Sequence, residues 1–283
     1  MTRKTKKILF YASVFLFIVL SFSISLYAQG YKYSLKEGKF VLTGAISVKV
    51  NVDANVFING KPEGETSFLG NSFGINRLVP GDYKITISRD GYSSWNKTAT
   101  VGEGFVSDFS NVLIFPTQGL EKEKLLVSFE EIFSELELLK ATPTPTPTPK
   151  KTPKPSGSPS PSPSPSPIED PFILKDKKLY KNTEGQLLEI ATNVLDFSLS
   201  NNGHKIAWWN NYEIWVMWLV DTNYQPFMKN GQIESITRFS IPINLATWYK
   251  GDNHLLIRFG KTEPHTYQIV EIDKRGGVNI AGF

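Results

Sequence analysis

The chain has 283 residues, enough for one large or two modest domains with hydrophobic cores of their own. It contains no cysteine, which excludes disulfide frameworks, thiol catalysis and zinc sites built on thiolates. The formal net charge is +4, and four cations near the start account for all of it: Arg3, Lys4, Lys6 and Lys7. The rest of the chain is neutral overall, so its charge does not indicate a nucleic acid as a partner.

The first predicted element is a transmembrane helix over residues 8–28, preceded by a basic tail over residues 1–7. These 21 residues carry no charge, and as a helix they would rise about 30 Å, the thickness of a bilayer's hydrocarbon core. The denser positive flank precedes the segment, so the positive-inside rule places residues 1–7 in the cytoplasm. We expect a single-pass anchor in the cell membrane, with the lipid bilayer as partner and the bulk of the chain extracytoplasmic.

A cleaved secretory signal is the alternative interpretation of this segment. Ser23 and Ser25 form the small-x-small pair that a signal peptidase can accept. The apolar stretch is long for a signal peptide, which favours a retained anchor. Both interpretations export the protein.

Residues 46–60 have the pattern of a β-strand followed by a hairpin turn. Apolar residues at 46, 48, 50 and 52 alternate with polar ones, which is typical of a half-buried strand. After a short apolar run, Asn59 and Gly60 form the dipeptide best suited to a tight hairpin, because both tolerate positive φ. Further strands are predicted from Pro80-Gly81 onward and over about residues 106–115.

These segments occur in the order typical of the PEGA domain, and residues 44–117 resemble that family. The matching segments are residues 53–61, 64–66, 78–83 and 90–92, together with Trp95. Residues 51–54 depart from the family's naming tetrapeptide, and Ser67 stands where proline is usual. The resemblance implies a small antiparallel β-sandwich over residues 29–117, used outside the cell and without catalytic residues. Tyr92 and Trp95 are expected to fill its core.

An amphipathic helix is predicted over residues 118–141. Leu125, Phe129, Ile132, Leu136 and Leu139 recur at steps of four and three and line one face. The other face is rich in glutamate, which argues against contact with an anionic membrane surface. We expect the helix to pack on a neighbouring sheet; a short self-associating seam is the alternative, so the oligomeric state stays open.

Residues 142–167 form a linker rich in proline, serine and threonine. The segment contains eleven prolines and has too few apolar residues to form a core. Such a composition favours extended polyproline II at about 3.1 Å per residue. The linker is therefore expected to hold two modules apart.

Two stretches of the region 168–283 repeat one pattern of strand, polar turn and strand. They cover residues 196–209 and 246–259, with His204 and His254 aligned, and apolar strands follow at 213–220 and 266–272. The turns resemble the blade motif of WD-like and TolB-like β-propellers, but the region is too short to close four four-stranded blades. We expect an incomplete, propeller-like antiparallel sheet, either from a shortened relative of longer proteins or with its edges covered by something else.

Five tryptophans accompany these repeats: Trp208, Trp209, Trp215, Trp218 and Trp248. Residues 214–220 are apolar on both faces, as in an inner strand of a sheet. We therefore expect the tryptophans to pack in a core rather than to form a platform that stacks on sugars.

No residue pattern indicates a catalytic, cofactor-binding or metal site. Residues 70–74 spell the Gly-x-Ser-x-Gly of a nucleophile elbow, but no helix is predicted after them, so we interpret them as a loop. The three histidines, His204, His254 and His265, lie in or beside turns without the spacing of a zinc helix. They are expected at the surface. The sequence thus predicts a protein that is not an enzyme.

The favoured hypothesis is a membrane-anchored envelope protein that scaffolds, or binds cell-surface polysaccharide or an envelope protein, through its PEGA-like module. One alternative is an extracytoplasmic sensory module that acts through a partner in the membrane. A glycan-active hydrolase is less favoured, because it requires paired carboxylates in one cleft. Glu213 with Asp221 or Glu234 would be such a pair, and nothing in the sequence places them together.

Overall fold

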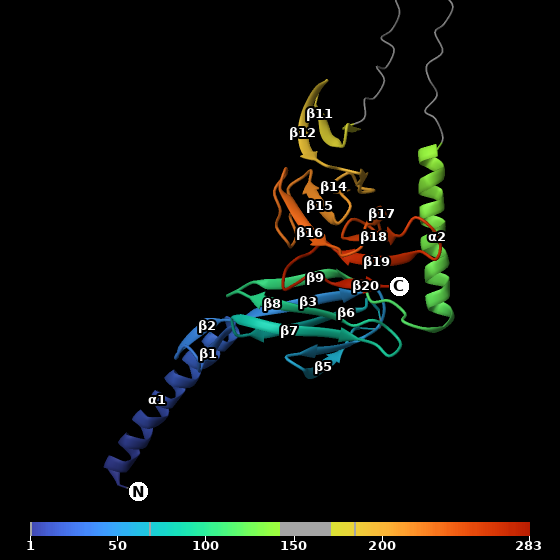
Figure 1. Cartoon of the computed structure of the whole chain (residues 1–283). Helices are drawn as coiled ribbons and strands as arrows, with labels where there is room; N and C mark the ends of the chain where they lie inside the picture. Colours follow the sequence, from blue (N-terminus) through green and yellow to red (C-terminus); the bar gives the residue numbers. More distant parts are fainter. Residues whose placement is uncertain (1, 68, 142–170, 184) are drawn as a thin grey trace, which may run out of the picture. The chain divides into compact units, whose positions relative to one another are not determined.

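The computed structural model describes residues 2–67, 69–141, 171–183 and 185–283. It confirms the predicted fold class, mainly β with an apolar N-terminal helix (Figure 1). The chain forms two compact units. Unit 1 comprises Met1–Gly119, Asp221–Lys229 and Asp273–Ala281; unit 2 comprises Leu120–Val220, Asn230–Ile272 and Gly282–Phe283. The predicted linker, residues 142–167, lies outside the described residues.

The helix α1 covers Arg3–Ala28, and none of its residues is buried. It is long and apolar enough to cross a membrane. The helix begins before the uncharged stretch and includes the basic residues of the predicted tail, because Thr2 caps it. The Thr2 hydroxyl accepts a hydrogen bond from the backbone N–H of Thr5 at 3.3 Å.

A small antiparallel hairpin follows α1 in unit 1 (Figure 1). Its strands are β1 (Tyr31–Ser34) and β2 (Lys39–Leu42). The rings of Tyr33 and Phe40, which lie opposite each other, meet edge to face with 5.3 Å between their centroids.

Two sheets with one shared core form a β-sandwich in unit 1, with strand orders β6-β3-β9 and β5-β4-β7-β8. The strands are β3 (Gly44–Val50), β4 (Asn55–Ile58), β5 (Lys61–Glu65), β6 (Ser72–Leu78), β7 (Gly81–Ser88), β8 (Trp95–Val101) and β9 (Val106–Val112). Trp95 of β8 is 2% exposed and meets Phe109 of β9 edge to face, with 5.4 Å between ring centroids. Trp95 therefore fills the core as predicted, and Tyr92 packs against the same core.

The hairpin between β4 and β5 has the predicted turn, but one strand pairing differs from expectation. Asn59 and Gly60 have φ angles of 52° and 77°, which matches a two-residue turn with positive φ at both positions. β3 and β9, in contrast, run parallel, with Ala45 opposite Val106. Parallel pairing requires a crossover connection, and the strands β4 to β8 between them supply it.

The described residues of unit 2 include three antiparallel sheets in which strands adjacent in sequence pair with each other. Their orders are β10-β11-β12, β13-β14-β15-β16 and β17-β18-β19; β20 is divided between the units, with Ile280 and Ala281 in unit 1 and Gly282 in unit 2. The strands are β10 (Phe172–Lys175), β11 (Lys178–Thr183), β12 (Gln186–Thr192), β13 (Asp196–Leu199), β14 (Lys205–Trp209), β15 (Glu213–Trp218), β16 (Ile233–Arg238), β17 (Ile243–Trp248), β18 (His254–Phe259), β19 (Thr266–Glu271) and β20 (Ile280–Gly282). The resemblance of these sheets to propeller blades stays a prediction.

The tryptophans of this region pack in the core, as the sequence predicts. Trp208, Trp209, Trp218 and Trp248 are buried, and Trp215 is half-buried. β15 lies between β14 and β16, so its apolar residues on both faces fit an inner strand.

The helix α2 (Gly119–Ala141) packs within unit 2, which confirms the expected packing on a sheet. Phe129 and Phe133 are 0% exposed. The ring of Phe133 stacks on that of Tyr267 in β19, with 6.0 Å between centroids. The predicted apolar face is wrong in detail: it omits Phe133 and includes Leu139, which is 69% exposed. Apolar spacing alone does not determine which side of a helix with several apolar residues faces the sheet.

A buried ion pair joins the two repeat-related turns of unit 2. The Lys205 side chain is 1% exposed, and its ammonium donates to the Asp252 carboxylate at 2.9 Å and to the Asp252 carbonyl at 2.8 Å. Burial lowers the pKa of Lys205, although Asp252 opposes this. Burial would raise the pKa of Asp252, but hydrogen bonds from Asn202 and Lys205 outweigh it and hold that pKa below the usual value. At Asp252, hydrogen bonding to the charged form therefore has a larger effect on the pKa than burial.

Candidate functional site

The residues that resemble a nucleophile elbow do not form one. Ser72 begins β6 and pairs with Lys49 of β3, and a strand rather than a helix follows it. The interpretation as a loop is therefore wrong for residues 72–74, because pairing with β3 satisfies their backbone. The elbow chemistry needs a turn from strand to helix, which this segment lacks.

The three histidines differ in their surroundings. His204 is exposed and His265 is half-buried. His254 is 4% exposed, so its expected surface position is wrong. It is the first residue of β18, an inner strand whose pairing with β19 carries it into the sheet. Among the described residues, no group of three or more His, Asp and Glu side chains could hold a metal ion.

The carboxylates considered for glycan hydrolysis are engaged with other groups. Glu213 accepts hydrogen bonds from Arg238 at 3.0 Å and from Asn210 at 3.0 Å. Asp221, which belongs to unit 1, pairs with Lys229 at 3.0 Å. Glu234 accepts a hydrogen bond from Gln232 at 3.2 Å, so each of the three carboxylates interacts with another side chain.

A cavity lined by both polar and aromatic groups lies in unit 1, beside β8 and β9. It has a volume of about 520 Å³. The strands contribute Thr98, Ala99, Thr100, Ser107 and Phe109, the turn between them Gly102 and Phe105, and the two later segments of unit 1 Gln225, Pro226, Phe227, Arg275 and Gly276. Residues more than a hundred positions apart in the sequence therefore build one site.

The Gln225 side chain takes the place of a neighbouring strand at the open edge of β9. Its amide N–H donates to the carbonyl of Val106 at 2.8 Å, and its amide oxygen accepts from the backbone N–H of Asp108 at 3.1 Å. A strand at a sheet edge otherwise leaves such groups unpaired. Gln225 thus closes this edge and fixes one wall of the cavity.

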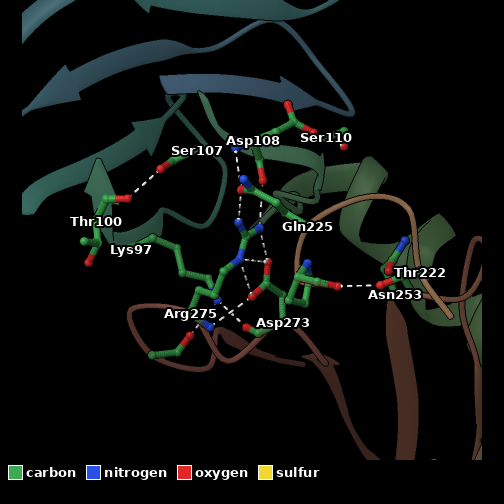
Figure 2. A network of polar contacts seen from close by, with 12 residues as sticks. Lys97, Thr100, Ser107, Asp108, Ser110, Thr222, Gln225, Asn253, Asp273 and Arg275 are labelled. Atoms are coloured by element: carbon green, nitrogen blue, oxygen red, sulfur yellow. Dashed lines mark hydrogen bonds and ion pairs between the residues drawn. The ribbon is translucent and has the colours of Figure 1, made fainter. Parts of the chain in front are cut away.

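Arg275 belongs to the same wall of the cavity, and Figure 2 shows its contacts with Gln225 and Asp273. Its guanidinium donates to Gln225 at 2.5 Å, to the carbonyl of Asp108 at 2.7 Å, and to Asp273 through Nε at 3.0 Å and Nη2 at 2.6 Å. The guanidinium carbon also lies 4.4 Å from the centroid of the Phe109 ring. These bonds use four of the five N–H donors of the guanidinium, which leaves one on Nη1 for a ligand.

Lys97 of β8 holds the segment Asp273–Ala281 against that strand. Lys97 is 2% exposed and occupies an inward-facing position of an edge strand. Its ammonium donates to the carbonyl of Gly277 at 2.6 Å and to that of Asp273. An inward-pointing charge on an edge strand disfavours pairing with a strand of another molecule. Here the carbonyls of Asp273 and Gly277 accept hydrogen bonds from the buried ammonium.

Gly276 lets this segment approach β8 closely. The backbone N–H of Thr98 donates to the carbonyl of Gly276 at 3.4 Å, and that of Asn96 donates to the side chain of Asn279 at 3.2 Å. A Cβ on Gly276 would lie 2.1 Å from the Thr98 carbonyl oxygen, and its φ is 63°. Only glycine fits both requirements.

The cavity combines exposed aromatic rings with hydrogen-bonding groups. Phe105 is 67% exposed and Phe227 is 68% exposed, whereas Phe109 is buried. Thr98, Thr100 and Arg275 supply polar atoms in the lining. Arg275 is paired with Asp273, so its charge is largely balanced. This lining suits a polar, uncharged ligand with an apolar face.

Sequence reasoning identified none of the residues that build this site. Lys97, Gln225 and Arg275 belong to no sequence motif that indicates a binding site. A glutamine and an arginine in loops are ordinary surface residues until the fold brings them to a strand edge. An inward-facing lysine in the otherwise alternating strand 95–101 was the one signal that a partner segment covers this edge.

No protein-family model matches the chain, and no curated protein matches it. The resemblance to the PEGA domain therefore stays a prediction.

Proposed function

We propose that this protein is a non-enzymatic, single-pass membrane protein that displays its β-rich part outside the cytoplasm and binds a component of the cell envelope. The observation that carries the proposal is α1, an apolar helix without any buried residue. An apolar surface of this size is unfavourable in water and suits a bilayer. The helix leads directly into the hairpin and sandwich of unit 1, so the anchor would place that unit beside the membrane.

The charges around α1 support an orientation with the N-terminus in the cytoplasm. Arg3, Lys4, Lys6 and Lys7 lie at the start of the helix, whereas Glu37 interrupts the lysines that follow it. Positive flanks are retained on the cytoplasmic side. The sandwich and its cavity would then face the cell envelope.

For the ligand we propose a segment of cell-surface polysaccharide, bound in the cavity beside β8 and β9. A sugar ring offers hydroxyl groups to Thr98, Thr100 and Arg275 and a C–H face to Phe105 and Phe227. The volume of about 520 Å³ lies within the usual range of sites for small ligands. The resemblance to PEGA domains, which implies a module used outside the cell, agrees with this proposal.

The test is retention of isolated envelope polysaccharide by the full chain in mild detergent. We expect Phe227→Ala to weaken retention about tenfold, because a stacked aromatic ring contributes roughly 1–1.5 kcal/mol. Leu69→Ala, which removes a 95% exposed side chain outside the cavity lining, is the matched control and should bind normally. Equal retention by the two variants would contradict the proposed site. Crosslinking in cells to a single membrane protein, without polysaccharide, would instead favour the sensory alternative.

A further inference from the structure

A second cavity lies at the C-terminal end of α1, where the helix would leave the bilayer. It has a volume of about 260 Å³. Its lining consists of Tyr27, Gly30, Tyr31, Lys32, Thr43 and Arg77. Two of these described lining residues are cations and none is acidic. The cavity is thus cationic at the depth where lipid headgroups would lie.

The end of α1 is fastened to the sandwich, which fixes the shape of this cavity. Gly30 follows the helix with a φ of 88°, a common way for a helix to end. Its carbonyl accepts hydrogen bonds from the backbone N–H of Thr43 at 2.9 Å and from the Thr43 hydroxyl at 2.7 Å. The strand that begins at Gly44 therefore holds the helix end.

Arg77 reaches the helix through an irregularity in β6. The register between β3 and β6 shifts between Gly44 and Ile46, and Arg77 has a φ of 61°, rare for a residue with a side chain. The guanidinium carbon lies 3.7 Å from the centroid of the Tyr27 ring. Stacking on the ring leaves the edge of the guanidinium, with its N–H donors, directed away from the ring. A strained residue that places a cation is typical of a functional position.

The hairpin next to the cavity has the composition of a membrane interface. Its turn exposes Leu35 (91%), and its strands expose Tyr33 (49%) and Phe40 (50%). Lys32 and Lys39 lie on the same hairpin. Aromatic rings and lysines concentrate at the level of the headgroups in membrane proteins. Both the helix end and the hairpin thus suit the surface of the bilayer.

We propose that Arg77 and Lys32 bind the phosphate group of an anionic phospholipid in the leaflet next to the C-terminal end of α1. This inference rests on the proposed membrane insertion of α1. The planar guanidinium can donate two parallel hydrogen bonds to phosphate oxygens, and the ammonium adds a second charge. Tyr31 in the lining carries a hydroxyl that can donate a further hydrogen bond to the headgroup, whereas the Thr43 hydroxyl already donates to the Gly30 carbonyl. A bound headgroup would fix the sandwich at a defined height above the membrane.

The experiment measures lipid retained by the full chain in mild detergent, using native mass spectrometry with equal amounts of phosphatidylglycerol and phosphatidylcholine. We expect about a tenfold preference for phosphatidylglycerol, because both lipids carry the phosphate but Arg77 and Lys32 would repel the choline cation of phosphatidylcholine. Arg77→Asn should abolish the preference. Asparagine tolerates positive φ, so this variant removes the cation without adding backbone strain. Lys84→Gln, which removes one exposed charge from β7, should keep the preference.

The chain loaded with phosphatidylglycerol is then titrated with inorganic phosphate to distinguish the two sources of a phosphate group. Displacement of bound phosphatidylglycerol by millimolar phosphate would assign the site to a soluble phosphate and overturn the lipid as ligand. An unchanged preference in Arg77→Asn would overturn the site itself. Membrane insertion is checked separately, by resistance of the chain to extraction from membranes with carbonate. Loss of insertion refutes the proposed function, whereas normal insertion without lipid preference refutes only this inference.

Discussion

Replacing Gly276 with alanine tests whether the segment Asp273–Ala281 closes the edge of β8. The new Cβ would lie 2.1 Å from the Thr98 carbonyl oxygen and 2.5 Å from the Thr98 nitrogen, both backbone atoms that a side-chain rotation cannot move. Alanine at a φ of 63° also costs about 1–2 kcal/mol. The segment must therefore move away from the strand.

The size of the effect follows from the contacts that this movement breaks. The Lys97 ammonium loses the carbonyl of Gly277, now at 2.6 Å, and hydrogen bonds to charged groups contribute about 1.5–3 kcal/mol each. Together with the backbone term, this loss should lower the free energy needed to detach the segment Asp273–Ala281 from the edge of β8 by about 3 kcal/mol or more. Such a change corresponds to about a hundredfold faster hydrogen exchange.

The assay is hydrogen exchange by mass spectrometry on the full chain, read at the amides of Asn96 and Thr98. Both amides donate to the segment Asp273–Ala281. Gly60→Ala is the matched control, because Gly60 has a φ of 77° but a Cβ there meets nothing within 4 Å. If Gly276→Ala exchanges at these two amides no faster than Gly60→Ala, the segment does not cover this edge, and the wall of the cavity is misassigned.

Further predictions concern unit 2, whose unfolding is read by tryptophan fluorescence because five of the six tryptophans lie there. Asp252→Ala removes the carboxylate that pairs with the buried Lys205 ammonium and should lower the free energy of unfolding by about 3–5 kcal/mol. Lys205→Met should lower it by less than half of that amount, because the Asp252 side chain is 15% exposed and keeps access to water. The pKa of Asp252 is held below its usual value, so the stability it contributes is present above about pH 4 and is lost as the pH falls through the lowered value; Asp252→Ala should flatten this acid dependence in urea titrations. Phe133→Ala should cost about 3–5 kcal/mol, because Phe133 is 0% exposed, while Leu138→Ala, at a 69% exposed position, should change the free energy of unfolding by less than about 0.5 kcal/mol. If Asp252→Ala and Lys205→Met lowered the free energy of unfolding equally, the buried ion pair would be misdescribed. If Phe133→Ala and Leu138→Ala lowered it equally, the buried face of α2 would be misidentified.

The features that the sequence predicts correctly are those that local chemistry determines. An uncharged run of 21 residues forms most of α1, and Asn59-Gly60 forms the turn between β4 and β5 because few other dipeptides tolerate positive φ twice. Trp208, Trp209 and Trp218 of unit 2 are buried, because they are large apolar side chains in the inner strands β14 and β15. Each of these conclusions depends on neighbours in the sequence and not on distant contacts.

The features that the sequence does not predict depend on contacts between distant segments. The parallel pairing of β3 with β9 is decided by the path of the chain through the strands between them. His254 follows a polar turn in the sequence, yet it is buried because it is the first residue of the inner strand β18. Gln225 and Arg275 become a cavity wall only because two loops lie against β9. Local periodicity contains no information about such juxtapositions.

The most direct test of the account is the side of the membrane on which the β-rich units lie. Because the chain has no cysteine, single cysteines give an unambiguous readout with a membrane-impermeant maleimide on intact cells. The variants are Thr2→Cys before α1, Glu63→Cys in unit 1 and Asn201→Cys in unit 2, all at exposed positions. The account predicts labelling of Glu63→Cys and Asn201→Cys on intact cells, and of Thr2→Cys only after the membrane is permeabilised. Protection of Glu63→Cys and Asn201→Cys on intact cells, with labelling only after lysis, would contradict it.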